Sequence, residues 1–501
     1  MNLKQLIIGV LLLICLACNN APKRDAMEIR VACKACVGKD IRIFQHSVIR
    51  GKEKNLYQGR FDGSGSMLIK LPNQDTLGVY LKVNQGDSTY FFTYLYLHPN
   101  THIEVDFQKK DTRFSGDLAL INTYMDDLRK IDDKRSDYKN VWSTENDRIK
   151  SKDSLETYLA AIKLFGADFD KKVSSDATLS KYESDLLHSL NTGFETYRRL
   201  DFDFFKLLED RQLYYDNEDS EQINKYQDSV THAYFSGLAI NPHLLKVNGS
   251  YYNWYLNIGS RMPELMEIYY KQYKAYRVSY DYLKTTVRSN ASLAPHHDFV
   301  MSNLIAGYVL DGVAYEEMYE LISAFRKDYP HSKYLSELEE ILGEYATLKP
   351  GTPMKDFTMS DKNGKTFRLS DYKGKLIYVD VWATWCGPCV EEFPYSKKLI
   401  ERYRKHQDLV FLFLSKDNNL KSWKNFLLKN PSLRGVHAIQ LTKKDDYDHL
   451  NIDSNNVMRL YKISGIPRYI LIGKDGRIIN YNAASPSELV KNKYLDSLLT
   501  I

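Results

Sequence analysis

The sequence shows little bias of charge and, beyond its first residues, no long hydrophobic run. Among 501 residues, 69 basic and 64 acidic side chains leave a formal net charge of +5. Because this excess is a small difference between large, interspersed numbers, it does not favour nucleic-acid binding. No repeat of fixed period is strong enough to indicate a solenoid. The length exceeds that of one ordinary core and favours roughly two to four domains.

The one apolar run near the amino terminus, Leu6 to Ala17, is too short to span a membrane comfortably. Lys4 precedes the run and Cys18 follows it, which is typical of an export signal. The stretch CLACNN resembles the lipobox of bacterial lipoproteins, although Cys15 stands where that motif usually has Leu. We therefore expect residues 1–18 to be a signal peptide with a lipobox.

The lipobox resemblance implies that Cys18 is acylated and that lipid chains hold the protein at a membrane surface. An ordinary cleaved signal peptide is the alternative for the same residues. Both predict export from a bacterial cell. No acidic run follows Cys18 to favour display on the cell surface, so we expect an anchored lipoprotein that faces the periplasm.

Cysteine is scarce, with six residues, of which two lie in the leader. The other four form two Cys-x-x-Cys pairs, Cys33 with Cys36 and Cys386 with Cys389. In an oxidising compartment such pairs close into disulfides unless something reduces them. The surroundings of each pair must therefore decide whether the chain has one redox centre or two.

Two different periodicities divide the first two-thirds of the chain. Apolar residues alternate with a period of two through residues 27–112, as in Leu77 to Val83, which predicts a small antiparallel β domain resembling a sandwich or an open barrel. From about Phe114 the spacing becomes three and four residues, as in Leu118 to Leu128. Helical spacing continues on both sides of Pro330, which predicts a helix, a turn and a helix there. We therefore expect a helical domain over residues 113–346.

A third domain is predicted for residues 348–501, after a break marked by Pro350, Gly351 and Pro353. Two alternating runs joined at Asn363 and Gly364 indicate a hairpin. Buried strands are then predicted at residues 376–383 and 409–415, with a helix from Val390 to Lys405 between them and a hairpin and helix at the end. Alternating strands and helices of this kind indicate a three-layer α/β domain.

The stretch WCGPC lies where the first buried strand of this domain gives way to the helix. A helix start favours the thiolate of Cys386, because the helix dipole and free amides stabilise the negative charge. Cys389, one turn further on, is suited to resolve a mixed disulfide. Gly387 and Pro388 fit a tight helix entry, where proline is tolerated.

Two carboxylates accompany the pair. Asp380 lies six residues before Cys386 in an apolar run, where a carboxyl without a task is costly to bury. Glu392 lies three residues after Cys389 on the same helical face. Either carboxylate could exchange the proton that thiol chemistry requires, although spacing alone equally allows a solvated helix surface for Glu392.

These residues resemble the thioredoxin superfamily, and in particular its exported, membrane-anchored thiol-disulfide oxidoreductases of the TlpA and ResA type. The resemblance spans roughly Leu348 to Ile501, less than a third of the chain. It implies a catalytic dithiol, a buried acid at Asp380 and a catalytic Glu392. The supporting positions it implies are Trp385, Gly387, Pro388, Pro394 of the Cys-x-x-Cys-x-x-Glu-x-Pro extension, and Pro467 as a cis-proline facing the disulfide.

Two rival interpretations of the dithiol find no support. A zinc site requires a second Cys or His pair at suitable spacing, and none is present. A peroxidase of the peroxiredoxin type requires Thr or Ser where this chain has Ala383, and Pro where it has Val379. We therefore expect neither a metal nor another cofactor.

The Gly-Pro dipeptide between Cys386 and Cys389 is that of thioredoxin and predicts a reductant. The expected partners are disulfide-containing exported client proteins and, as the resemblance implies, a membrane thiol donor upstream. A different class of function is a lipid-anchored module that binds a peptide or glycan, with the thioredoxin-like domain as an accessory.

The first pair, Cys33 and Cys36, has no preceding Trp, no Gly-Pro and no helix start. In a straight strand, at about 3.3 Å per residue, the two Cα atoms would lie about 10 Å apart, too far to bond. A disulfide therefore requires a turn at Lys34 and Ala35. We expect a structural disulfide here, with free thiols, a relay to Cys386 or a metal site as alternatives.

Overall fold

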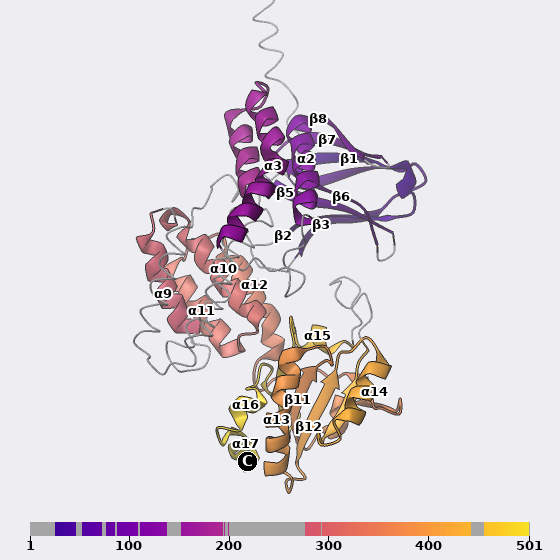
Figure 1. Cartoon of the computed structure of the whole chain (residues 1–501), viewed down its shortest axis with the longest axis vertical. Coiled ribbons are helices and arrows are strands. Elements are labelled where there is room, and N and C mark those ends of the chain that lie inside the picture. Colours follow the sequence, from indigo (N-terminus) through magenta and orange to yellow (C-terminus); the bar gives the residue numbers. More distant parts are fainter. Residues whose placement is uncertain are drawn as a thin grey trace, which may run out of the picture. The chain divides into compact units, whose positions relative to one another are not determined.

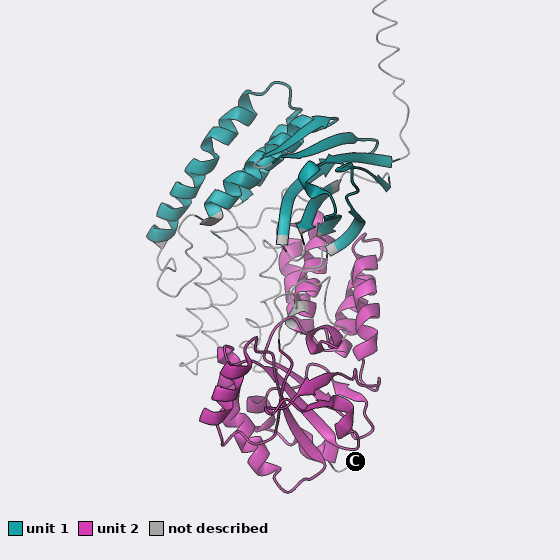
Figure 2. Cartoon of the chain, turned by 90° about the vertical axis from the view of Figure 1, so that its right-hand side faces the viewer, with its two compact units in different colours: residues 1–47, 51–218, 237–255 teal, residues 48–50, 219–236, 256–501 magenta. Residues whose placement is uncertain are grey.

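The computed structural model describes residues 26–46, 53–72, 77–85, 88–108, 111–137, 152–193, 195, 199, 276–291, 293–441 and 455–499. Cys18 and the rest of the leader lie outside these residues. The chain forms two compact units, shown in Figure 2. The first comprises residues 1–47, 51–218 and 237–255, and the second comprises residues 48–50, 219–236 and 256–501. Each unit is described by itself.

The first unit contains two four-stranded sheets, ordered β4-β1-β7-β8 and β3-β2-β5-β6. The strands, labelled in part in Figure 1, are β1 (Ala26–Ala32), β2 (Asp40–His46), β3 (Glu53–Arg60), β4 (Ser66–Pro72), β5 (Leu77–Gln85), β6 (Ser88–Leu97), β7 (His102–Gln108) and β8 (Asp111–Gly116). One core joins both sheets, because Ile29 and Val105 of the first pack in the same cluster as Ile41 and Leu81 of the second. The structure thus confirms the β domain predicted from the alternating pattern.

Two details of this β domain differ from the sequence prediction. β1 pairs with β7 in parallel, whereas the pairs β1–β4, β7–β8, β2–β3, β2–β5 and β5–β6 are antiparallel. The sheet also continues past residue 112, since Phe114 pairs with Val105 and β8 ends at Gly116. The sequence pattern places the start of the helical region too early in the chain, because β8 is largely exposed and lacks a clear apolar face.

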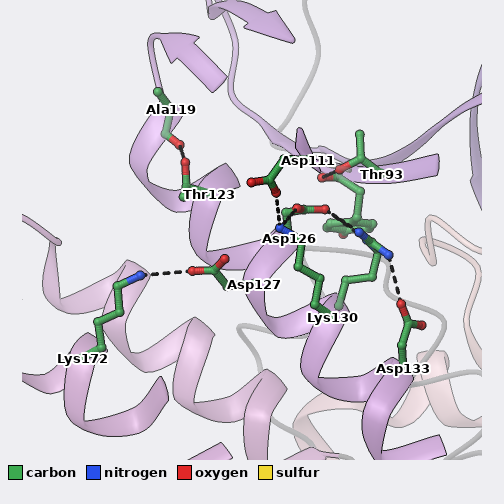
Figure 3. Close-up of polar contacts among 11 residues, drawn as sticks. Thr93, Asp111, Ala119, Thr123, Asp126, Asp127, Lys130, Asp133 and Lys172 are labelled. Carbon is green, nitrogen blue, oxygen red and sulfur yellow. Dashed lines mark hydrogen bonds and ion pairs between the residues drawn. The ribbon is translucent and has the colours of Figure 1, made fainter. Parts of the chain in front are cut away.

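Among the described residues, the first unit contains α2 (Ala119–Asp137) and α3 (Lys152–Ser175), and residues 181–193 are also helical. The Asn122 side chain fixes α2 to the sheet, because it accepts a hydrogen bond from Tyr96 N at 2.8 Å and donates one to Tyr96 O at 3.0 Å. Figure 3 shows further links, from Lys130 of α2 to Asp111 of β8 at 2.6 Å and from Lys172 of α3 to Asp127 at 3.0 Å.

The second unit begins, within the described residues, with α9 (Tyr276–Ser289), α10 (His297–Asp311), α11 (Tyr315–Asp328) and α12 (Leu335–Tyr345). Short 3-10 turns at Ala294–His296 and Ala346–Leu348 precede α10 and follow α12. The helix, turn and helix predicted around Pro330 are confirmed. Of the described helices in the region where one helical domain was predicted, residues 113–346, α2 and α3 lie in the first unit and α9–α12 lie in the second.

The rest of the second unit is a three-layer α/β domain, as predicted. Its seven-stranded sheet has the order β10-β9-β13-β12-β11-β14-β15. The strands are β9 (Thr358–Ser360), β10 (Thr366–Arg368), β11 (Leu376–Trp382), β12 (Leu409–Ser415), β13 (Val436–Ile439), β14 (Arg468–Ile472) and β15 (Ile478–Asn480). Every residue of β11 and β12 is buried, so both faces of the central sheet are covered.

The helices in the described part of this domain are α13 (Gly387–Arg402), α14 (Leu420–Lys429), α15 (Val457–Leu460), α16 (Pro486–Leu489) and α17 (Tyr494–Leu499), with a 3-10 turn at Leu369–Tyr372. Figure 1 shows α13 alongside β11 and β12. Tyr378 and Trp382 of β11 share a core with Phe393 of α13, which fixes the helix to the sheet. Across the described residues, no helix combines the length and apolar character needed to cross a membrane.

Candidate active site

The dithiol lies between β11 and α13. Cys386 is the N-cap of α13, and its Sγ accepts a hydrogen bond from Cys389 N at 3.3 Å. This amide and the helix dipole stabilise negative charge on Cys386 when the pair is reduced. Gly387 and Pro388 form the first turn, where proline removes no helical hydrogen bond.

A disulfide joins Cys386 to Cys389, with Cα atoms 5.3 Å apart, so the structure shows the oxidised pair. Cys386 is 5% exposed and Cys389 is 1% exposed. The neighbouring Trp385, in contrast, is 60% exposed. Cys386 is thus the sulfur nearer the surface, and Cys389 is shielded from a large partner.

Pro467 approaches the disulfide from a distant part of the chain. The Ile466–Pro467 peptide bond is cis, and Ile466 O lies 3.7 Å from Cys386 Sγ. The structure therefore places Pro467 beside the dithiol, where the family resemblance implied it.

Asp380 is buried beneath α13. It lies between Tyr378 and Trp382, whose side chains pack in the same core as Cys389, so alternation along β11 directs the carboxyl toward that face. Within the described part of the chain, neither carboxylate oxygen has a hydrogen-bond partner. Burial raises the pKa of Asp380 well above its ordinary value, and the nearby charge of Glu392 raises it further.

Glu392 is half-buried on α13 and is not simply a solvated surface residue. Its Oε2 accepts a hydrogen bond from Ser487 N, and its Oε1 accepts one from Ser487 Oγ, both at 2.8 Å. These bonds tie α13 to α16. Pro394, two residues further along α13, is exposed.

Asp417 is a site residue that the sequence reasoning missed. It is 2% exposed, and its carboxylate accepts hydrogen bonds from Thr384 N at 3.1 Å, Thr384 Oγ1 at 2.6 Å and Ser415 Oγ at 2.7 Å. Thr384 lies two residues before Cys386, so Asp417 fixes the loop that carries the dithiol. The sequence does contain a signal for Asp417, which directly follows the strand β12. The carboxyl ends of the parallel strands β11 and β12 meet at one edge of the sheet, so a polar residue there lies near the dithiol loop that follows β11.

The other cysteine pair is also a disulfide, with Cα atoms 5.2 Å apart. A 3-10 turn at Lys34–Cys36 supplies the turn that such a bond requires. Cys33 and Cys36 are 1% and 0% exposed and lie in the core of the β domain. Neither stands at the start of an α-helix. No group of three or more His, Cys, Asp or Glu side chains in the described segments could hold a metal ion.

Together, the three-layer fold, the dithiol at a helix start and the adjacent cis-proline define a thiol-disulfide oxidoreductase with a thioredoxin-like domain. A model of the Redoxin family matches residues 349–499. Thiol-disulfide oxidoreductase ResA of Bacillus anthracis is 30% identical over 132 residues, which cover 26% of this chain and 68% of that protein.

A second ResA protein, from Bacillus subtilis (strain 168), is 25% identical over 150 residues, which cover 30% of this chain and 76% of that protein. Among solved structures, the thioredoxin domain of a thiol-disulfide oxidoreductase from Bacteroides vulgatus matches with 25% identity and a TM-score of 0.26, covering 30% of this chain and 99% of that one. The chain belongs to the TlpA/ResA-like thiol-disulfide oxidoreductases.

Proposed function

We propose that the protein reduces disulfides of exported client proteins at the periplasmic face of a bacterial membrane, where acylated Cys18 anchors it. The observation that carries the proposal is the geometry of Cys386, which caps α13 beside Pro467 and next to an exposed Trp385. A sulfur so placed is stabilised as a thiolate, and Cys386 is the less buried of the two cysteines, 5% exposed against 1% for Cys389.

Reduction proceeds in two exchanges. The Cys386 thiolate attacks one sulfur of the client disulfide, forms a mixed disulfide and releases the client's other sulfur as a thiolate. Cys389 then loses its proton and attacks Cys386 Sγ, which releases the client's remaining sulfur. Two electrons pass from the dithiol to the client, and the product is the Cys386–Cys389 disulfide seen here.

We propose that Asp380 accepts the proton of the buried Cys389 and later returns it. Burial raises the pKa of the carboxyl toward that of a thiol, which favours exchange of a proton between the two groups. The deprotonated carboxyl accepts the Cys389 proton when a mixed disulfide is resolved. The protonated carboxyl returns it when a donor dithiol reduces the enzyme again.

The Gly387-Pro388 dipeptide supports the reducing direction, because the residues between the cysteines help to set the potential. In an oxidising compartment a reductant must be recharged. We propose a membrane thiol carrier as the donor, which would reduce the Cys386–Cys389 disulfide by the reverse of the exchanges above.

A Cys389→Ser variant tests this function in cells. Cys386 can still attack a client disulfide, but no sulfur remains to resolve the adduct. We expect exported proteins to accumulate as mixed disulfides on Cys386, identified by mass spectrometry after non-reducing separation.

The matched control is the Cys386→Ser, Cys389→Ser double variant, which should trap nothing. If the single variant traps no more protein than the double variant, client reduction is wrong. If the double variant also retains the full cellular function, the cysteines are dispensable and the peptide- or glycan-binding alternative is favoured.

A further inference from the structure

Arg468 is a buried cation directly after Pro467, at the first position of β14. It is 7% exposed, and its Nη1 donates hydrogen bonds to Gly312 O at 3.2 Å and to Asn482 Oδ1. A buried guanidinium is costly unless it is hydrogen-bonded, so these acceptors must compensate its desolvation. Gly312 belongs to the turn between α10 and α11 and is 156 residues away in sequence.

The turn that follows α10 has a glycine, Gly312, at the point where the Arg468 side chain contacts it. Gly312 is the C-cap of α10 and has a φ of +89°, a left-handed conformation that favours glycine. A Cβ at this position would lie 1.9 Å from Arg468 Nη1 and 2.3 Å from Cζ, well inside contact distance. The carboxyl end of α10 also carries partial negative charge, which attracts a cation.

Further contacts fix the same turn to the α/β domain. Tyr481 Oη donates a hydrogen bond to Val313 O at 2.7 Å. The ring of Tyr345, the last residue of α12, lies 5.9 Å from that of Tyr481. The end of α10 and the end of α12 therefore hold the β14–β15 hairpin from one side.

This hairpin leads directly to the dithiol. Ile466, whose carbonyl lies 3.7 Å from Cys386 Sγ, is separated from Arg468 only by Pro467. Arg468 also pairs with Val381 of β11, next to the strand end that leads to the dithiol. A shift of Arg468 would thus move the backbone that faces the reactive sulfur.

We propose that Arg468 is a positioning residue: held by the Gly312 carbonyl, it fixes the Pro467 loop, so that the α10–α12 helices determine how a disulfide substrate docks at Cys386. The inference goes beyond the proposed function. It requires only the oxidoreductase activity, in either direction.

Steady-state reduction of a peptide disulfide by the full chain, with dithiothreitol as donor, tests the role. We expect Arg468→Met and Gly312→Ala each to raise KM about tenfold, the equivalent of one charge-assisted hydrogen bond, with kcat changed less than about twofold. Because both changes break one contact, the double variant should raise KM no further than either single variant. Arg468→Lys keeps the charge but loses the guanidinium geometry, and it should give an intermediate KM.

Arg477→Met is the matched control, because Arg477 Nη1 also donates to a backbone carbonyl, Gly351 O, but at the far end of the same hairpin. It should leave KM unchanged. The proposal is overturned if folded Arg468 and Gly312 variants keep the parent KM, if their effects add, or if Arg477→Met raises KM equally. Should Arg468→Met fail to fold, Arg468→Lys and Gly312→Ala decide by the same criteria.

Discussion

At the residue scale, Asp380 combines a cost in stability with a chemical use. A carboxyl without a hydrogen-bond partner in a buried core is unfavourable when charged. The same burial raises its pKa and makes it a proton acceptor matched to a thiol. The residue thus follows a general pattern, in which groups with strongly perturbed pKa values gather at functional sites.

Stability should depend on pH through Asp380. Its folded-state pKa is raised, so the folded protein keeps a proton that the unfolded chain loses above its ordinary pKa of about 4. Stability is therefore fully present below that pH and declines as the pH rises toward the folded pKa. Asp380→Asn removes this dependence, so at about pH 8 it should stabilise the oxidised protein by about 1.4 kcal/mol for each unit by which folding raises the pKa of Asp380.

Urea unfolding followed by tryptophan fluorescence at about pH 3 and about pH 8 measures the effect, which should nearly vanish at the lower pH because Asp380 is then largely protonated in both states. Glu391→Gln, on the exposed side of α13, is the control and should change neither value. An Asp380→Asn protein less stable than the parent at the higher pH would contradict this account.

At the scale of elements, the start of α13 and the turn at Lys34–Cys36 show why two Cys-x-x-Cys pairs differ. Cys386 caps an α-helix of 16 residues, whose dipole favours a thiolate. Cys36 ends a three-residue 3-10 turn, and its sulfur is enclosed by the β-domain core. One pair therefore has the environment of a reactive thiol, and the other has that of a structural disulfide.

Replacing both Cys33 and Cys36 with Ser should leave disulfide-reductase turnover intact. Because the bond closes a very short loop, the chain-entropy model predicts a loss of only about 2 kcal/mol of stability. Turnover of the peptide disulfide and urea unfolding of the purified protein provide the two measurements. Lost turnover in a protein that still folds would instead indicate electron relay between the two pairs.

At the scale of the whole molecule, the second unit joins helices α9–α12 to the thioredoxin-like domain. The Redoxin match begins at residue 349, so it includes none of these helices. The contacts of Arg468 and Tyr481 with the α10–α11 turn nevertheless join these helices to the domain that carries the dithiol.

The proposed anchor is also a property of the whole molecule. In bacterial cells the parent protein should sediment with membranes, and Cys18→Ser should move it to the soluble fraction or leave it unprocessed, because acyl chains can no longer be attached. Cys15→Ser, which leaves the acceptor sulfur in place, is the matched control. Membrane association of a Cys18→Ser protein whose leader has been cleaved would refute a lipid anchor at this residue.

The sequence by itself determined the β domain, the α/β domain and the reactive dithiol, because alternation, helical spacing and WCGPC are local patterns. It also indicated Asp380, since a carboxyl in a buried strand is conspicuous. Only the tertiary structure showed that Glu392 bonds Ser487, that Asp417 holds Thr384 and that Arg468 bonds Gly312. Each of these bonds joins residues 33 or more positions apart, and no local pattern records which distant segments pack together.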